Sequence, residues 1–293
     1  MPGTMMQDIG TGSNGRPRPA GFLADPQEWA LFIDIDGTLL DVAATPDAVH
    51  VPQRLARTLK AISRGLGGAV ALSTGRRVAD ADRLFAPLKL VTSGVHGTEV
   101  RTAEGGDIKL LAPMIAPAFV QRINDICLIA PGILVEQKGA GVAIHYRNAP
   151  ETAAQLEAEL ARLIDGSTEY VLRPGRKVLE VLPKGYSKGT SLAWVMRLAP
   201  FHGRRPIMVG DDDGDEPGIL AAERLSGFGL KVAGEHFSQA VADFDSAADV
   251  RAWLGALAKR FEPQLAQPLR NASSVRRRSP PLREEADRRS DRS

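Results

Sequence analysis

Two aspartates that stand two residues apart are the first candidates for chemistry in this chain of 293 residues. Asp34 and Asp36 follow an apolar run, Ala30-Leu31-Phe32-Ile33, and precede Gly37. Residues i and i+2 of a strand point to the same face, so both carboxylates lie on one side where the strand ends. Carboxylates this close repel each other, and a hard cation such as Mg²⁺, which prefers oxygen ligands, offsets that repulsion. The pair therefore predicts a metal-assisted phosphate site.

A second acidic cluster follows another apolar run. Five acidic residues lie within Asp211–Glu216, directly after Ile207-Met208-Val209-Gly210. An acidic solvated loop is the plainer interpretation of such a cluster. Its position after a buried strand instead favours a second set of oxygen ligands, which Mg²⁺ would take.

Two further segments combine hydroxyl or ammonium groups with a predicted helix start. Ser73-Thr74-Gly75-Arg76 follows the apolar run Ala69–Leu72 and opens a helix, so its hydroxyls and N–H groups either cradle a phosphate or cap the helix. Tyr186-Ser187-Lys188-Gly189 also precedes a helix, where a lysine is commonly only a solvated charge. Each of these segments leaves both interpretations open when it is taken alone.

Taken together and in this order, the four segments resemble the four motifs of the phosphatases of the haloacid dehalogenase superfamily. The resemblance implies that Asp34 is the nucleophile and Asp36 the general acid/base. It implies that Thr74, rather than Ser73, binds the phosphate and that Lys188 neutralises it. Arg76 either reaches the substrate or braces the loop.

The same resemblance implies a Mg²⁺ cofactor. Asp34, the backbone carbonyl of Asp36 and Asp211 are its expected ligands, and Asp215 is the expected second residue of the acidic cluster at the metal. Asp212 is a further candidate. Gly214 stands where the family often has threonine, and this difference changes little in the expected metal site.

Strand and helix signals alternate along the body of the chain, which predicts an α/β fold with a Rossmann-like, doubly wound parallel sheet. We expect this catalytic core to comprise residues 25–112 and 184–260. Residues 113–183 have an αββαββ pattern that resembles the inserted α+β cap of the sugar phosphatases of the superfamily. The segments 1–24 and 261–293 are polar, the second is rich in arginine, and both are expected to be disordered.

Composition limits the cellular setting. The chain is 43% hydrophobic with a formal net charge of +2, and it lacks an apolar run long enough for a membrane span. Its single cysteine, Cys127, excludes an internal disulfide and lies in an apolar stretch, as a buried thiol does. We expect a cytoplasmic monomer with no membrane or nucleic-acid partner. The basic run Arg276-Arg277-Arg278 leaves an anion-binding arm as an alternative.

Four more segments resemble elements of the trehalose-6-phosphate phosphatases, over roughly residues 28–258. They are Ser93–Glu99 with its His96-Gly97 pair, Glu136-Gln137-Lys138-Gly139, His145-Tyr146-Arg147, and Pro174–Val181. The resemblance implies hydrolysis of trehalose 6-phosphate, a phosphoric monoester, in trehalose biosynthesis. The implied substrate-binding residues are Asp34, Ile35, Asp36, Arg76, His96, Glu136, Lys138, His145, Arg147, Lys177 and Glu180.

Alternatives to this substrate remain open. The charged strand residues of the cap could be solvated faces, and His145 could be a packed core histidine. A related phosphatase would act on sucrose phosphate or on a glycosyl phosphoglycerate. A protein of another class, a catalytically silent binding module, would be expected to have lost residues of the motifs, whereas all of them are present here.

Overall fold

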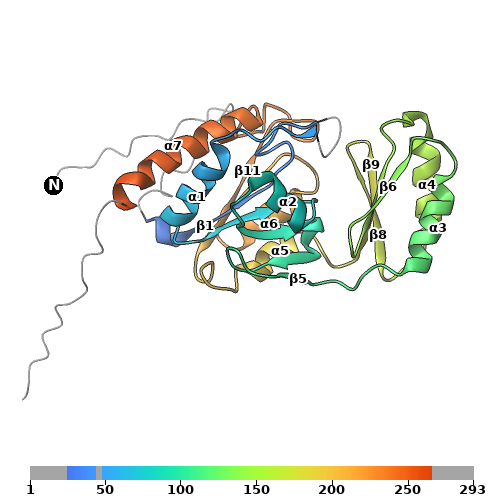
Figure 1. Cartoon of the computed structure of the whole chain (residues 1–293), viewed down its shortest axis with the longest axis horizontal. Coiled ribbons are helices and arrows are strands. Elements are labelled where there is room, and N and C mark those ends of the chain that lie inside the picture. Colours follow the sequence, from blue (N-terminus) through green and yellow to red (C-terminus); the bar gives the residue numbers. More distant parts are fainter. Residues whose placement is uncertain (1–24, 44–47, 266–293) are drawn as a thin grey trace, which may run out of the picture.

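One seven-stranded sheet forms the larger part of the computed structural model, which describes residues 25–43 and 48–265 (Figure 1). Its order is β11–β10–β1–β2–β3–β4–β5, with parallel pairing from β11 to β3 and antiparallel pairing of β4 and β5. The strands are β1 (Trp29–Ile33), β2 (Val70–Ser73), β3 (Val91–Gly94), β4 (Glu99–Arg101), β5 (Ile108–Leu110), β10 (Arg205–Gly210) and β11 (Phe228–Lys231). The predicted doubly wound α/β fold is confirmed.

Helices cover the seven-stranded sheet, and every residue of the interior strand β1 is buried. Because both faces of such a strand are covered, it is a continuous apolar run rather than an alternating one. Helix α1 packs against α7, and α5 packs against α6. The helices are α1 (Leu55–Gly65), α2 (Val78–Phe85), α5 (Lys188–Val195), α6 (Glu216–Arg224) and α7 (Ala247–Leu265).

Helix α7 is longer than the sequence predicted. The sequence pattern predicts a final helix over Ser246–Ala258 and a core that ends at residue 260, whereas α7 continues to Leu265. Phe261 is fully buried and packs so closely on α1 that a Cβ at Gly65 would lie 2.3 Å from its ring. This contact continues the core beyond the predicted boundary. The rest of the predicted tail, and the tail predicted for residues 1–24, lie outside the described residues.

A second, smaller sheet lies beside the first and has the antiparallel order β6–β7–β9–β8. Its strands are β6 (Leu134–Gln137), β7 (Val142–His145), β8 (Tyr170–Gly175) and β9 (Val178–Pro183). Helices α3 (Pro117–Cys127) and α4 (Ala153–Ile164) lie on the side of this sheet that faces away from the larger sheet (Figure 1). The small sheet and its helices share a hydrophobic core of their own, which includes Leu156, Leu160 and the buried Cys127. We refer to residues 113–183 as the cap.

Strand β8 extends further than predicted. Because Pro174 and Gly175 usually mark a turn, the sequence pattern predicts a strand over Tyr170–Leu172 only. The structure shows that pairing with β9 continues through Gly175. Strand β8 is an edge strand, and a proline there costs no hydrogen bond on its solvent side. The reversal comes instead at Lys177, whose φ is 57°. The extension carries Arg173 and Gly175 alongside the cleft described below.

Two connections join the cap to the seven-stranded sheet, one after β5 and one after β9. The hydroxyl of Tyr186 in the second connection donates a 2.8 Å hydrogen bond to the carbonyl of Leu111 in the first. The two connections are therefore held beside each other.

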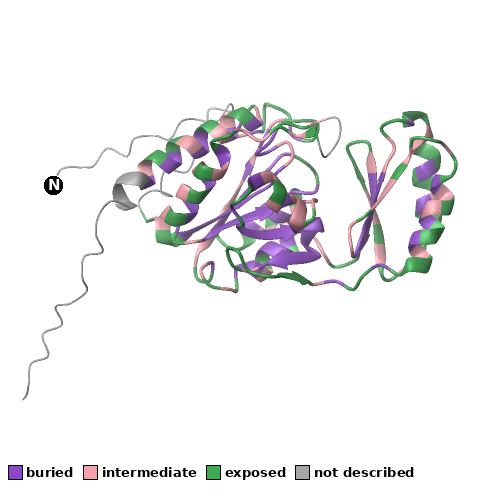
Figure 2. Ribbon diagram, viewed as in Figure 1, coloured by how far each residue is buried: buried purple, intermediate pink, exposed green. Residues whose placement is uncertain are grey.

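Figure 2 shows buried residues concentrated in the larger sheet and along the inward sides of its helices. Within the described ranges, no helix combines the length and the apolar character that a membrane span requires.

Candidate active site

The acidic residues meet where neighbouring strands of the large sheet end. Asp34 directly follows β1, Thr74 follows β2 and Asp211 follows β10. Strand β1 pairs in parallel with β2 on one side and β10 on the other, and the chain order reverses at this point. Ligands of open α/β sheets bind in the crevice at the carboxyl ends of the strands on either side of such a reversal. The fold therefore places the candidate residues at its expected binding crevice.

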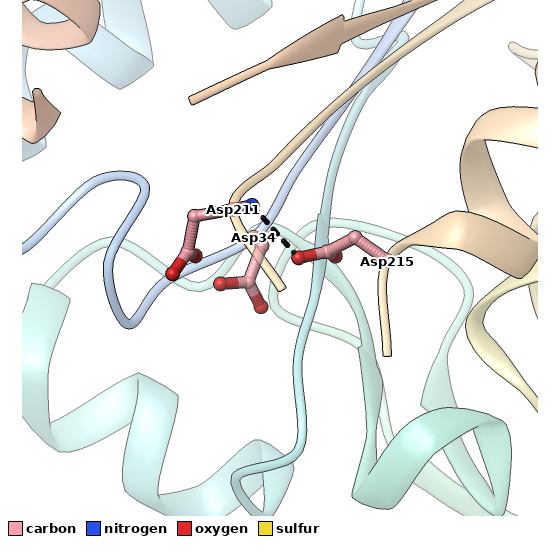
Figure 3. Close-up of side chains that lie close together, drawn as sticks. All are labelled: Asp34, Asp211 and Asp215. Carbon is pink, nitrogen blue, oxygen red and sulfur yellow. Dashed lines mark hydrogen bonds between the residues drawn. The ribbon is translucent and has the colours of Figure 1, made fainter. Parts of the chain in front are cut away.

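Three buried carboxylates gather in this crevice. One oxygen of each of Asp34, Asp211 and Asp215 lies within 4.8 Å of the others (Figure 3). Thr38 donates a 2.9 Å hydrogen bond from its hydroxyl to Oδ1 of Asp211. Gly37, with a φ of 86°, makes the approach possible, because a Cβ there would lie 2.0 Å from Oδ2 of Asp211. An oxygen-only donor set of this kind suits a hard divalent cation.

The side chain of Lys188, the first residue of α5, extends into the same cluster of carboxylates. Its Nζ lies 2.7 Å from Oδ1 of Asp34 and 2.7 Å from Oδ1 of Asp215, and its side chain is 2% exposed. Burial by itself would lower the pKa of Lys188, but the carboxylates of Asp215 and Asp34 raise it well above its ordinary value. The ammonium group is therefore held as a fixed positive charge against Asp34.

Asp215 is fully buried, and protein groups occupy both of its oxygens. Oδ1 accepts from Lys188, while Oδ2 accepts from the backbone N–H of Asp211 at 3.0 Å and of Asp212 at 3.3 Å. Asp215 thus organises the lysine and the Asp211 loop. Asp212 has a half-exposed side chain, and its Oδ1 lies 4.0 Å from Lys188.

The clustered carboxylates of Asp34, Asp211 and Asp215 carry more negative charge than nearby positive groups balance. Burial raises the pKa of Asp34 to about 8, with Lys188 opposing the rise and Asp211 adding to it. Burial and the neighbouring carboxylates of Asp212 and Asp215 together raise the pKa of Asp211 to about 7. The single positive charge of Lys188 does not balance the negative charge of these carboxylates. A cation bound among these oxygens would favour their ionised forms, so the residues fit a divalent metal.

Asp36 points away from the buried cluster and pairs with Arg76. Nε and Nη2 of Arg76 each lie 2.6 Å from one oxygen of Asp36, whose side chain is 38% exposed. The side chain of Asp36 is thus not one of the three clustered carboxylates, which leaves the predicted metal contact to its backbone carbonyl.

Ile35, between the two aspartates, is completely buried in the core. Its side chain cannot meet a substrate, and the predicted contact is restricted to its backbone.

The loop after β2 places Thr74 beside this pair. Thr74 is buried, and its hydroxyl accepts a 3.1 Å hydrogen bond from the backbone N–H of Arg76. The hydroxyl of Ser73 is also buried, without a hydrogen-bond partner among the described residues. Gly75 and Arg76 line the cleft above Asp34.

The cap contributes the other wall of this cleft. Residues of the large sheet and of the cap line it together, among them Asp34, Asp36, His96, Glu136, Lys138, His145, Arg147, Arg173, Lys177, Glu180 and Lys188. All of the cap residues that the sequence predicted for the substrate are therefore brought to one cleft. His145 is not packed in a core: its Nε2 lies 3.0 Å from Oε2 of Glu136 at the cleft wall.

Glu180 joins the cap to the core. One carboxylate oxygen lies 2.7 Å from Nε2 of His96, and the other accepts a 3.2 Å hydrogen bond from Lys138. Lys138 also donates to the carbonyl of Gly75 at 3.2 Å. Burial alone would raise the pKa of Glu180, but its interactions with His96 and Lys138 bring that pKa well below its ordinary value. The structure thus has the cap closed on the loop after β2.

Sequence reasoning assigned no role to three residues of this region. Thr38 orients Asp211, and Glu99 contacts the first turn of α2. Arg173 lines the cleft opposite Glu180 in the pairing of β8 with β9, and its Nη1 is buried without a hydrogen-bond partner among the described residues. The alternation of a strand would have placed Arg173 on the cleft side had β8 been predicted to extend beyond Leu172.

Residues 32–249 match the protein family described as trehalose-phosphatase. The chain belongs to the trehalose-phosphatase family. The match includes both acidic segments, Lys188 and the whole cap. Recognition of the family from the sequence is thereby confirmed.

Curated relatives agree with the trehalose-phosphatase assignment. A probable trehalose-phosphate phosphatase of Sinorhizobium fredii is 38% identical over 236 residues, which cover 80% of this chain and 89% of that protein. The trehalose-6-phosphate phosphatase of Escherichia coli is 35% identical over 228 residues, or 78% and 85% of the two chains. The C-terminal domain of the Candida albicans trehalose-6-phosphate phosphatase has the same fold, with a TM-score of 0.71 at 19% identity over 82% of this chain and 94% of that one.

Proposed function

We propose that this chain hydrolyses trehalose 6-phosphate to trehalose and phosphate with the help of Mg²⁺. The observation that carries the proposal is the single cleft in which Asp34, Asp36 and Lys188 face the charged residues of the cap. The trehalose-phosphatase family match and the names of the relatives support the choice of substrate.

The first half-reaction uses Asp34 as the nucleophile. A carboxylate oxygen of Asp34 forms a bond to phosphorus while the bond from phosphorus to the sugar oxygen breaks, and Asp36 gives a proton to that leaving oxygen. Lys188, 2.7 Å from Asp34, lowers the repulsion between the attacking carboxylate and the phosphoryl oxygens. The product is trehalose and an aspartyl-phosphate on Asp34.

Water completes the reaction. Asp36, now ionised, accepts a proton from a water molecule as the water oxygen attacks phosphorus, and the bond to Asp34 breaks. Phosphate is released, and both aspartates return to their starting forms. Thr74 and the backbone N–H groups of the loop after β2 would hold the phosphoryl oxygens during both steps.

Asp34, Asp211 and the backbone carbonyl of Asp36 would hold Mg²⁺, with Asp215 orienting the Asp211 loop behind them. When bound, the cation supplies positive charge for the carboxylates and the phosphoryl oxygens. The buried, oxygen-only cluster and its deficit of positive charge support this assignment.

The cap supplies the sugar contacts. Glu136, Lys138, His145, Arg147, Lys177 and Glu180 offer carboxylate, ammonium, guanidinium and imidazole groups along one wall. Such groups form strong, charge-assisted hydrogen bonds with sugar hydroxyls. Contacts between the cap and the loop after β2 close the cleft and would exclude bulk water around the reacting phosphate.

The decisive experiment is phosphate release from a panel of sugar phosphates, with Mg²⁺ and with EDTA. The panel contains trehalose 6-phosphate, sucrose 6-phosphate, mannosyl phosphoglycerate and glucose 6-phosphate. A Mg²⁺-dependent preference for trehalose 6-phosphate is the expected result. Preference for another member would retain the chemistry and overturn the substrate, and inactivity on every member would favour a binding module.

A further inference from the structure

Residues 93–99, which join β3 to β4, are bonded along their length to the loop after β2. The backbone N–H of Thr74 donates to the carbonyl of Ser93 at 2.9 Å, and His96 donates to the carbonyl of Thr74 at 3.1 Å. The N–H of Val95 donates to the carbonyl of Arg76 at 2.9 Å. These bonds fix the backbone of the residues proposed to hold the phosphate.

The turn that makes these bonds has an unfavourable backbone. Val95 has a φ of 46° and His96 a φ of 52°, in the left-handed region that β-branched residues rarely adopt. Surrounding contacts must over-determine such a conformation, and residues held in this way concentrate at functional sites. The strained backbone of Val95 and His96 is therefore consistent with a functional role for the contacts that residues 93–99 make.

Glu99 completes this contact at the start of α2. Helix α2 begins at Val78, and its preceding residue Arg77 provides no side-chain cap. The buried carboxylate of Glu99, 21 residues away, accepts the hydrogen bond from the backbone N–H of Val78 instead. A negative charge at a helix N-terminus also interacts favourably with the helix dipole. Glu99 thus fixes the first turn of the helix that the phosphate-binding loop enters.

The contact is packed so closely that it depends on a glycine. Gly94 lies directly opposite Glu99 in the pairing of β3 with β4. A Cβ at Gly94 would come within 2.8 Å of the carbonyl oxygen of Arg76 and 2.9 Å of Oε1 of Glu99. Gly94 has a φ of −105°, so its backbone would accept alanine and the obstacle is the added methyl group alone. A substitution at Gly94 would therefore disturb the contact between Glu99 and α2 without changing Glu99 itself.

We propose that Glu99 is a positioning residue for phosphoryl transfer, which holds the loop of Thr74 and Arg76 in register with Asp34 and Asp36. This inference rests on the proposed phosphatase function and adds a residue to its machinery. Glu99 does not line the cleft and is not expected to touch the substrate. It acts through the backbone of α2, and through Arg76 on Asp36.

The first test compares Glu99→Ala with Glu99→Gln, because glutamine keeps an oxygen acceptor for the N–H of Val78. Misplacement of a reacting group by about 1 Å costs up to roughly a hundredfold in rate. We therefore expect Glu99→Ala to lower kcat for p-nitrophenyl phosphate by about tenfold to a hundredfold and to raise Ki for inorganic phosphate. Glu99→Gln is expected to restore most of both values. Glu104→Ala, in the exposed turn after β4, is the matched control.

Stability measurements separate positioning from a merely structural role. If Glu99 only stabilises the fold, Glu99→Ala lowers Tm while kcat per folded molecule and Ki for phosphate stay at the wild-type values, and the proposal is overturned. Equal losses in the alanine and glutamine variants would also overturn it, because they would show that the acceptor oxygen is not what matters.

A second variant covers the case in which Glu99→Ala does not fold. Gly94→Ala is expected to raise Ki for phosphate in the same direction, while Gly255→Ala, where an added Cβ meets nothing within 4 Å, leaves it unchanged. An unchanged Ki in Gly94→Ala would count against the proposal. Because p-nitrophenyl phosphate and inorganic phosphate do not require the sugar site, these results remain decisive even if trehalose 6-phosphate proves to be the wrong substrate.

Discussion

Arg76 binds both carboxylate oxygens of Asp36, through Nε and Nη2 at 2.6 Å each. The two groups lie 40 residues apart, and the pair joins the loop after β1 to the loop after β2. In this arrangement the two oxygens that would exchange a proton with the leaving group are both occupied. A phosphoryl group in the cleft offers Arg76 a competing anion, so release of Asp36 would accompany substrate binding.

Replacement of Arg76 by lysine tests this relationship. Lysine keeps the charge but loses the planar, two-point geometry of the guanidinium group. We expect Arg76→Lys to lower kcat/KM for trehalose 6-phosphate by about tenfold or more, as the loss of a charged hydrogen bond does. Arg83→Lys is the control, since Arg83 lies on α2 with a side chain that is 72% exposed. Steady-state kinetics equal to wild type would exclude a role for the two-point pair.

Asp34→Asn should abolish turnover and leave the fold intact. The amide is nearly isosteric with the carboxylate but is a far poorer nucleophile, and loss of a nucleophile costs at least about a thousandfold in rate. Phosphate release measures the loss, and circular dichroism checks the fold. Asp107→Asn, in the exposed segment before β5, should retain full activity. Substantial phosphate release by Asp34→Asn would remove Asp34 as nucleophile.

Glu180→Ala should separate the disaccharide substrate from a small one. Glu180 bonds Lys138 and His96 at the wall of the cleft, so its removal disturbs the sugar side more than the phosphate side. We expect KM for trehalose 6-phosphate to rise by about tenfold or more, and KM for p-nitrophenyl phosphate to change by less than about twofold. Glu157→Ala, exposed on α4 of the same cap, serves as the control. Equal effects on both substrates would contradict a recognition role for the cap.

Mg²⁺ should stabilise the folded chain as well as activate it. A ligand that binds only the folded state at about a hundred times its Kd adds about 2.7 kcal/mol, which is roughly 5 to 10 °C in Tm for a domain of this size. The shift measures metal binding independently of turnover. Asp211→Asn removes one of the clustered carboxylates and should reduce the shift. A Tm that is the same in Mg²⁺ and EDTA would argue against a cation at this cluster.

Cys127 should be unreactive in the folded protein. Burial raises the pKa of its thiol to about 11, so at pH 8 only about one thiol in a thousand is the reactive thiolate. Raising the pH should increase the rate of alkylation because the thiolate fraction grows as the pH approaches that pKa. Iodoacetamide labelling followed by mass spectrometry checks this, with labelling in guanidinium chloride as the positive control. Rapid labelling of the native chain at pH 8 would contradict the buried position.

Local patterns predicted much of this molecule because the elements obey short-range rules. The apolar run that ends at Asp34 became β1, and the run that ends at Gly210 became β10. Once both are parallel strands, their carboxyl ends must lie at one edge, so the proximity of Asp34 and Asp211 follows from the sequence. The antiparallel pair around Gly139 could be predicted for the same reason, from strand alternation and a turn residue.

Contacts between distant segments could not be predicted in this way. Thr38 and Asp211 are 173 residues apart, and nothing in either local sequence specifies their hydrogen bond. The buried position of Glu99 against α2 depends on a turn with two left-handed residues that are not glycine, which no propensity would favour. Arg173 was missed because Pro174 normally ends a strand, and only the edge position of β8 makes it tolerable there.

The hydrogen bond from Tyr186 to the carbonyl of Leu111 has a mechanical consequence. Because this bond holds the two connections side by side, the cap can move with least change elsewhere by rotating about the line through them. A rotation of this kind opens the cleft most at the end furthest from Tyr186 and least beside it. Both products would leave through that same opening, so the rate of this rotation would set an upper limit on turnover.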